Sequence, residues 1–173
     1  MSETLVTVIA IFLAAVLMFV FPLMAVSERN DDIAQLGVQT TTNEFVDNVK
    51  KTGVLSEQAY SSYLQSLGAT GNSFDVDVEL KILDENFSKK VGQANSSKIG
   101  ENVYYSIYTS QIEEELESKS KYVLKEGDMI SVSVKNTNLT ISQMLKNFFY
   151  SMTGSDSYQI AASTSGMITA NGK

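Results

Sequence analysis

Carboxylates are the main candidates for chemistry in this chain, because the sequence contains no histidine and no cysteine. Asp75, Asp77 and Glu79 alternate along a predicted strand, and Asp84 and Glu85 follow just beyond it. Alternate residues of a strand share one face, so these side chains could hold Ca²⁺ through oxygen ligands. We favour the simpler interpretation of a solvated strand face, because no EF-hand spacing is present. We therefore expect neither a metal nor a cofactor.

The same composition argues against an enzyme. Without histidine, the commonest general base and the Ser-His-Asp and Cys-His arrangements are excluded. No G-x-G-x-x-G, P-loop or G-x-S-x-G motif occurs. A carboxylate-based hydrolase using Asp75 and Asp77 is the remaining catalytic alternative, and we expect no catalytic residues. The net charge of −7 argues against a nucleic-acid partner, which would select clustered Lys and Arg.

Tyrosines form a second group to consider. Tyr104, Tyr105 and Tyr108 lie close together in a predicted strand over residues 103–108. They could form a contact patch for a partner, although half-buried tyrosines are common in sheets. The acidic run at residues 113–117 is interpreted as the solvated face of a short helix.

The element on which everything else depends is a charge-free apolar stretch at residues 5–26. As a helix it is long enough to cross a hydrocarbon core of roughly 30 Å. Pro22 lies inside it and predicts a kink or local unwinding, because proline lacks the ladder N–H. The organisation predicted is a membrane helix at residues 1–26, a helical extension at 27–53 and an extracytoplasmic head at 54–173.

A cleaved signal peptide is the alternative, since Ala25, Val26 and Ser27 resemble a small-x-small cleavage site. We favour a retained anchor, because the apolar run exceeds a usual signal core and no basic residue precedes it. Few basic residues flank the span, so orientation is assigned from the acidic folded head, which we place outside the cell membrane.

Two sets of residues lie on different faces of the predicted helical extension at residues 27–51. Val38, Thr42, Phe45 and Val49 follow helical spacing and should pack on the head. A second stripe carries Ile33, Leu36 and Thr40. It is either a residual continuation of the lipid-facing surface, which is the simpler interpretation, or a contact with another subunit. Gly53 should end the helix as a left-handed cap.

The head is predicted to be α+β with a mostly antiparallel sheet. Alternation predicts strands over residues 74–82, 103–108, 130–134 and 158–170, the last with a bend or bulge at Gly166. Ser56 should cap a helix whose apolar face carries Tyr60, Tyr63, Leu64 and Leu67, ending at Gly68. Ser110 and Glu113 should form a capping box before Ile112 and Leu116, and residues 125–128 a turn. A long loop is expected at residues 84–100.

A further capping box is predicted from Thr140 and Gln143, with Leu139 stapled onto Met144. A wide apolar face follows, which could dock a partner but which we interpret as core because the start signals favour a packed helix. Its members are Ile141, Met144, Leu145, Phe148, Phe149 and Met152.

The order of these features resembles the type IV pilin-like architecture, in particular the TadE-like minor pilins of Gram-positive bacteria. The likeness rests on residues 5–26 with Pro22, on the capped helix and turn at 56–71, and on the glycine-interrupted ending at 159–172. It implies that the apolar helix is stored in the membrane and then packs against other copies in a filament core. It also implies that an acidic residue near the N-terminus pairs with a neighbour's terminal amine, and Glu3 is the candidate.

From this resemblance we expect a structural subunit of a pilus or pilus-like surface assembly. Its partners would be itself or other pilin-like subunits, and its assembly residues Glu3, Pro22, Ile33 and Leu36. No basic leader precedes Glu3, so either a longer precursor exists or a prepilin peptidase does not process the chain. The alternative function is a single-pass membrane-tethered binding or assembly module of a secretion or conjugation apparatus.

Overall fold

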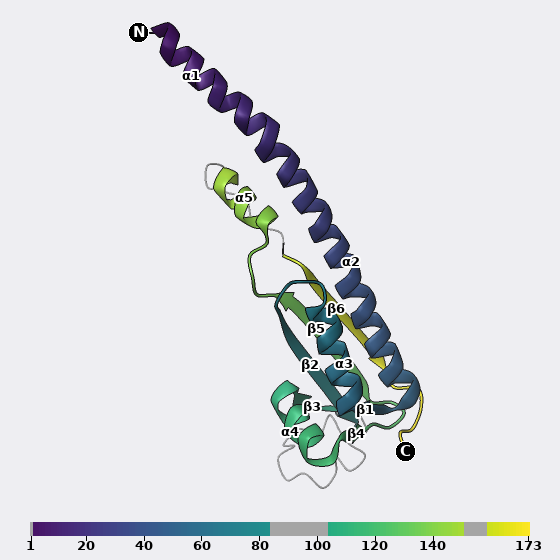
Figure 1. The fold of residues 1–173 in the computed structure, drawn as a ribbon. Helices are drawn as coiled ribbons and strands as arrows, with labels where there is room; N and C mark the ends of the chain where they lie inside the picture. Colours follow the sequence, from purple (N-terminus) through teal and green to yellow (C-terminus); the bar gives the residue numbers. More distant parts are fainter. Residues whose placement is uncertain (1, 84–103, 151–158) are drawn as a thin grey trace, which may run out of the picture.

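The chain folds as a long helical rod with an α+β head attached along its second half (Figure 1). The computed structural model describes residues 2–83, 104–150 and 159–173. The predicted loop at residues 84–100 therefore lies outside the described residues, as do Met152 and Tyr158. The predicted α+β class with an apolar N-terminal helix and an antiparallel sheet is confirmed.

The rod consists of α1 (Ser2–Ala15), a π-helical turn η1 (Val16–Val20) and α2 (Phe21–Thr52), joined without a break. The N–H of Phe21 donates to the carbonyl of Val16, five residues back instead of four. Pro22 follows at once, and its missing N–H removes the next rung of the ladder. The predicted local unwinding is confirmed, and it lies in the turn before the proline.

The second half of α2 forms one wall of the core. Val38, Phe45 and Val49 are buried, as predicted from their spacing. The Thr42 hydroxyl is buried as well and donates to the Val38 carbonyl at 2.7 Å. Gly53 ends the helix at φ 66°, and a Cβ there would clash with the carbonyl oxygen of Ala170. The predicted glycine cap is thus confirmed, and close approach of the C-terminal segment adds a second reason for glycine.

Strand β1 (Val54–Ser56) leads into α3 (Glu57–Gly68), which packs beside α2. The Ser56 hydroxyl accepts from the Ala59 N–H at 3.1 Å, which confirms the predicted N-cap. Tyr60, Tyr63 and Leu67 are buried, but Leu64 is 38% exposed. Its assignment to the buried face was wrong, because only one side of α3 meets the core.

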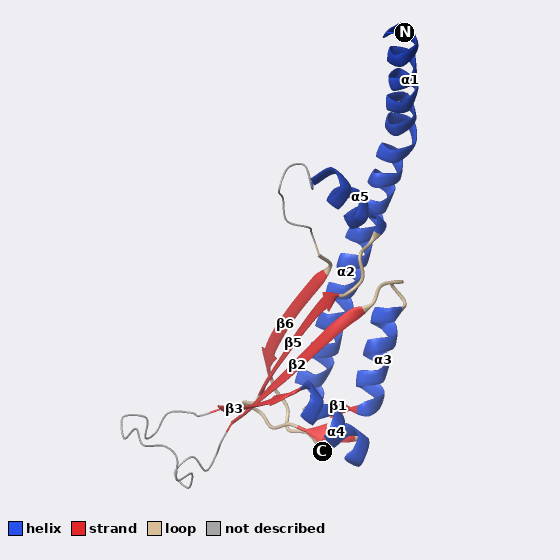
Figure 2. Ribbon diagram, turned by 90° about the vertical axis from the view of Figure 1, so that its left-hand side faces the viewer, coloured by secondary structure: helices blue, strands red, loops and turns tan. Residues whose placement is uncertain are grey.

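A four-stranded antiparallel sheet in the order β3-β2-β5-β6 forms the opposite wall (Figure 2). Its strands are β2 (Phe74–Leu83), β3 (Tyr104–Tyr108), β5 (Met129–Asn136) and β6 (Ala161–Met167). A separate pair joins β1 to β4 (Lys121–Val123). Helices α2 and α3 cover one face of the larger sheet, so each strand alternates between core and outer face as predicted.

Two sequence predictions about the sheet need correction. β6 is shorter than the predicted run of residues 158–170, although Ile160, Ala162 and Ile168 are buried on the expected face. Gly166 pairs with Ile130 in the regular ladder, so the expected bulge is wrong. A Cβ at Gly166 would meet the aliphatic end of the Lys50 side chain, which explains why a small residue fits there.

The cap of α4 (Thr109–Lys119) is displaced from its predicted position. The Gln111 side chain accepts from the Tyr108 N–H at 3.2 Å, whereas Ser110 and Glu113 form no box. Glu113 instead accepts from the Tyr60 hydroxyl at 2.9 Å, and the Thr109 hydroxyl accepts from the Val78 N–H at 2.8 Å. Long-range partners on α3 and β2 therefore determined where this helix begins.

The box predicted for the next helix is present. At the start of α5 (Ile141–Tyr150), the Gln143 side chain accepts from the Thr140 N–H at 3.0 Å, and the Thr140 hydroxyl accepts from the Gln143 N–H at 3.2 Å. The core interpretation of the apolar face of α5 is wrong for Ile141 and Met144, which are 54% and 51% exposed. The side chains of Phe148 and Phe149 lie outside the described ones.

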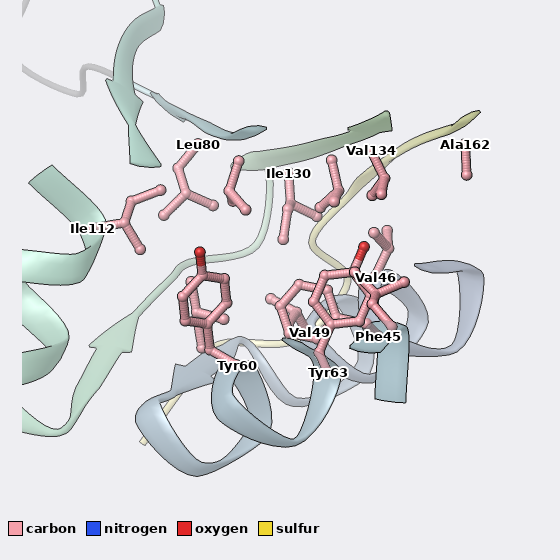
Figure 3. Close-up of a cluster of buried hydrophobic side chains, with 14 of the residues drawn as sticks. Phe45, Val46, Val49, Tyr60, Tyr63, Leu80, Ile112, Ile130, Val134 and Ala162 are labelled. Atoms are coloured by element: carbon pink, nitrogen blue, oxygen red, sulfur yellow. The ribbon is translucent and has the colours of Figure 1, made fainter. Parts of the chain in front are cut away.

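The hydrophobic core of the described residues lies between the sheet and α2 with α3 (Figure 3). Phe45, Tyr60 and Tyr63 face Leu80, Ile130 and Val134 across it. The rings of Phe45 and Tyr63 stack with centroids 4.3 Å apart. Burial raises the pKa of the Tyr63 phenol and, together with the Glu113 carboxylate, that of the Tyr60 phenol. Both hydroxyls therefore stay neutral and act as hydrogen-bonding members of the core.

Candidate assembly surface

The largest exposed apolar surface belongs to residues 2–26, which we call the stem. In the described part of the chain, one helix, Glu3–Thr52, is long and apolar enough to cross a membrane. Its most apolar 18 residues have a mean hydropathy of 2.9, and none of them is buried. Side chains point outward on every side of the stem, and the hydrophobic core of the described residues includes none of them. Exposed large members are Leu5, Val6, Val8, Ile9, Ile11, Phe12, Leu13, Leu17, Met18, Phe19, Phe21, Leu23 and Val26.

Beyond the stem, exposed apolar residues continue on one side of α2. Ile33 and Leu36 are 62% and 67% exposed, and with Val26 they form what we call the apolar stripe. At about 100° per residue, the stripe lies on the side of α2 opposite Val38 and Phe45. The packing predicted for the first face is therefore confirmed, and the stripe faces away from the head.

The four residues predicted to act in assembly do not meet within one chain. Glu3 is exposed in the first turn of α1, where a carboxylate suits the positive end of the helix dipole. Pro22 lies just after η1, and Ile33 and Leu36 lie in the stripe. At about 1.5 Å per residue, Glu3 and Ile33 are about 45 Å apart along one continuous helix. They can act together only between copies of the chain.

A polar junction, which sequence reasoning missed, attaches the head to α2 directly after the stem. We call it the collar, and it consists of three contacts. The Thr140 hydroxyl donates to the Asp31 carboxylate at 2.7 Å, with both residues buried. Lys146 pairs with Glu28 at 3.0 Å. The Gln35 side chain donates to the Ala161 carbonyl at 2.6 Å and accepts from the Ala161 N–H at 2.9 Å.

The collar could have been suspected from the sequence in part. Glu28, Asp31 and Gln35 follow the i, i+3, i+7 spacing of one helical face, directly after an apolar span. Their partners lie more than a hundred residues later in the chain, so no local pattern could pair them. Because Asp31 and Thr140 are withdrawn from water, removing one partner leaves the other buried and unsatisfied.

The carboxylate row lies where it was predicted, on the outer face of β2. Asp75 and Asp77 are exposed, while Glu79 accepts from the Ser106 hydroxyl at 2.7 Å. Asp77 and Glu79 line an open hollow of about 570 Å³ that also includes Ser131 and Ser133. Within the described ranges, no three His, Cys, Asp or Glu side chains are grouped closely enough to hold a metal ion.

The tyrosines of β3 divide between two roles. The Tyr104 hydroxyl donates to the Gly127 carbonyl at 3.2 Å, across the end of the sheet. Tyr105 and Tyr108 are 43% and 59% exposed, and Tyr108 lines the same hollow as Asp77 and Glu79. Because Tyr105 and Tyr108 are an odd number of residues apart in β3, they face opposite sides of the sheet and do not form the single contact patch that was considered.

Comparison of the chain with protein-family models, with curated proteins and with solved structures finds no match.

Proposed function

We propose that this chain is a structural subunit of a pilus or pilus-like surface assembly. The stem anchors the chain in the cell membrane as a single span and then packs against stems of other pilin-like subunits, with the head outside the membrane. The observation that carries the proposal is the apolar stripe. Ile33 and Leu36 keep an apolar surface exposed on α2 beyond the span, on the side that the head leaves open.

The physical argument is one of geometry. Membrane anchoring alone needs apolar residues only across a hydrocarbon core of roughly 30 Å. Exposed Ile33 and Leu36 lie past the charged residues Glu28, Arg29 and Asp32, where lipid no longer surrounds the helix. A neighbouring stem lying along this side would bury the stripe without meeting the head. The resemblance to the pilin-like architecture supports the same reading.

A retained stem is part of the proposal. The potential cleavage site ends at Ser27, which is buried within an uninterrupted helix. Cutting there would remove the stem and leave the head with no means of assembly. Mass spectrometry of the native protein should find its first residue before residue 5. A mature N-terminus after Ser27 would overturn the proposal.

Cysteine crosslinking tests the packing directly, because the chain has no cysteine of its own. We expect Leu36→Cys to form crosslinks between copies of the chain in native membranes or sheared surface material. Ser118→Cys, exposed on α4 at the far end of the head, is the matched control. Electron microscopy of the same material with antibody to the head should show decorated filaments. Dispersed monomers with no Leu36→Cys crosslink would contradict the proposal.

The second candidate is a membrane-tethered binding or assembly module of a secretion or conjugation apparatus. The hollow on the outer sheet face favours it, since Asp77, Glu79 and Tyr108 line it together with Thr109 and Ser110 at the start of α4. This function predicts crosslinks from Ser133→Cys to a different protein, with none between copies through Leu36→Cys.

A further inference from the structure

Helix α5 presents its polar face to the protein and its apolar face to the surroundings. Ser142 and Gln143 are 1% and 2% exposed, and Lys146 pairs with Glu28 on α2. On the opposite side of the same helix, Ile141 and Met144 are 54% and 51% exposed. A helix on the surface of a water-soluble domain normally has the reverse arrangement. The orientation therefore favours an apolar environment next to this face of α5.

The position of α5 indicates which environment that is. Lys146 and Thr140 attach the helix to Glu28 and Asp31, and the charge-free stretch ends at Val26. At about 1.5 Å per residue, Glu28 lies only about 3 Å beyond that end. In both ribbon views α5 lies at the level of the middle of the rod and extends from the sheet towards the α1 end (Figures 1 and 2). A bilayer around the stem would have its headgroup layer at the level of α5.

We propose that α5 is an interfacial helix, which lies in the headgroup layer of the membrane with Ile141 and Met144 against the acyl chains. Amphipathic helices of this kind bury their apolar face roughly 5–10 Å deep at the headgroup–acyl boundary. Leu139, 60% exposed just before α5, lies next to the same boundary. The collar then has a second role, because it holds the lipid-facing helix at a defined height on the rod and so sets how far the head stands from the membrane.

This inference rests on the membrane insertion of the stem proposed above, so the experiment measures both. Single cysteines are introduced into the full chain as Met144→Cys, Leu13→Cys and Ser118→Cys, and each is labelled with the fluorophore bimane. The proteins are reconstituted at low protein-to-lipid ratio into phosphatidylcholine vesicles, with or without lipids brominated near the headgroup end of the acyl chain. Aqueous iodide is used as the second quencher.

For Met144→Cys we expect blue-shifted emission, loss of intensity in shallow-brominated lipid and protection from iodide. Ser118→Cys, on α4 at the opposite end of the head, should show the reverse pattern. Leu13→Cys reports the stem and should be quenched by lipid whatever α5 does. If Leu13→Cys is quenched by lipid while Met144→Cys is quenched by iodide, the interfacial role of α5 is overturned and the anchor stands. If neither is quenched by lipid, the proposed membrane anchor fails as well.

A second copy of the chain is the other possible occupant of this face. Oxidation of unlabelled Met144→Cys in the same vesicles separates the two cases. A disulfide-linked dimer that forms at low protein density would show that protein covers Ile141 and Met144, which overturns the proposal. A second labelled variant, Ile141→Cys, should reproduce the Met144→Cys pattern, since both side chains share one face of α5.

Discussion

In the stem, Leu13 and Met18 are 53% and 74% exposed, whereas in the head Leu80 and Ile130 are completely buried. The two regions thus use apolar residues in opposite ways. In the head they are removed from water by the chain itself, at roughly 25 cal/mol per Å² of apolar surface. In the stem most of the large apolar side chains stay exposed in the described part of the chain, so we expect lipid or other subunits to cover them. The stability of the head should therefore come from contacts within the chain. The stem should depend on its surroundings.

The largest effect is expected in the stem, from a change that removes the apolar character on which this comparison depends. The double change Leu13→Arg with Leu17→Arg should abolish stable membrane association, since each Arg near the centre of a span costs about 2.5–3.5 kcal/mol on insertion scales. Vesicle flotation of the full chain measures it. Near-UV circular dichroism should stay unchanged, because the first tyrosine in the chain is Tyr60. Gln39→Arg, exposed beyond the span, is the control. Full flotation of the double variant would refute the assignment of the stem.

The next largest effect is in the head core. Ile130→Ala should lower the free energy of unfolding by about 2–5 kcal/mol, because a fully buried side chain leaves a cavity. Thermal unfolding of the full chain in detergent, followed by the near-UV signal of the tyrosines, measures the loss. Ser131→Ala on the outer face of the same strand is the matched control. Equal behaviour of the two variants would contradict the assigned core face.

The collar lies between the two regions and should show an intermediate effect. Thr140→Val removes the hydroxyl that donates to the buried Asp31 carboxylate and accepts from the Gln143 N–H. We expect a loss of about 1–3 kcal/mol, the usual result of leaving a buried polar group unsatisfied. Thr137→Val, whose exposed hydroxyl donates to the Ser73 carbonyl, is the control. The same thermal assay measures the stability of both variants. An unchanged stability of Thr140→Val would show that the collar is not a stabilising contact.

A smaller effect is expected at the cap of α3. Ser56→Ala should cost about 1 kcal/mol, because the Ala59 N–H loses its side-chain acceptor. Ser62→Ala, exposed in the interior of the same helix, should be neutral. Denaturant titration of the two variants compares them directly. A loss at Ser62 equal to that at Ser56 would contradict the cap.

The smallest effect on stability is expected in the apolar stripe, where the effect on assembly should be large. Leu36→Ser should change the free energy of unfolding by less than about 0.5 kcal/mol, as is usual at exposed positions. The same change should reduce crosslinking between copies of the chain through an Ile33→Cys reporter. Leu64→Ser on α3, which removes a partly exposed leucine from the head, is the control for assembly. Unchanged crosslinking in Leu36→Ser would remove the stripe from the proposed interface.

Much of the fold could be predicted because its signals are local. The alternation of β2 and β5, the stripe of Val38, Phe45 and Val49, and the caps at Ser56 and Thr140 depend on spacing that any short window displays. Predictions failed where a distant residue competed for a group. Glu113 does not form the predicted capping box with Ser110, because its carboxylate accepts a hydrogen bond from the Tyr60 hydroxyl at 2.9 Å.

The candidate site shows the same division. That Ile33 and Leu36 lie on a different face from Val38 follows from helical geometry alone. The collar could not be predicted, because Asp31 meets Thr140 and Gln35 meets Ala161 only after the sheet has folded against α2. For α5, periodicity predicts an apolar face but does not say which way that face points.

By itself, then, the sequence determined a charge-free helix long enough to cross a membrane and an α+β head with a known inward face on each strand. Backbone periodicity and side-chain polarity decide these features within a few turns or residues. Only the tertiary structure decided where the head attaches to the rod and which way α5 faces. Both depend on hydrogen bonds and ion pairs between segments far apart in the chain, and such contacts exist only once packing has brought the segments together.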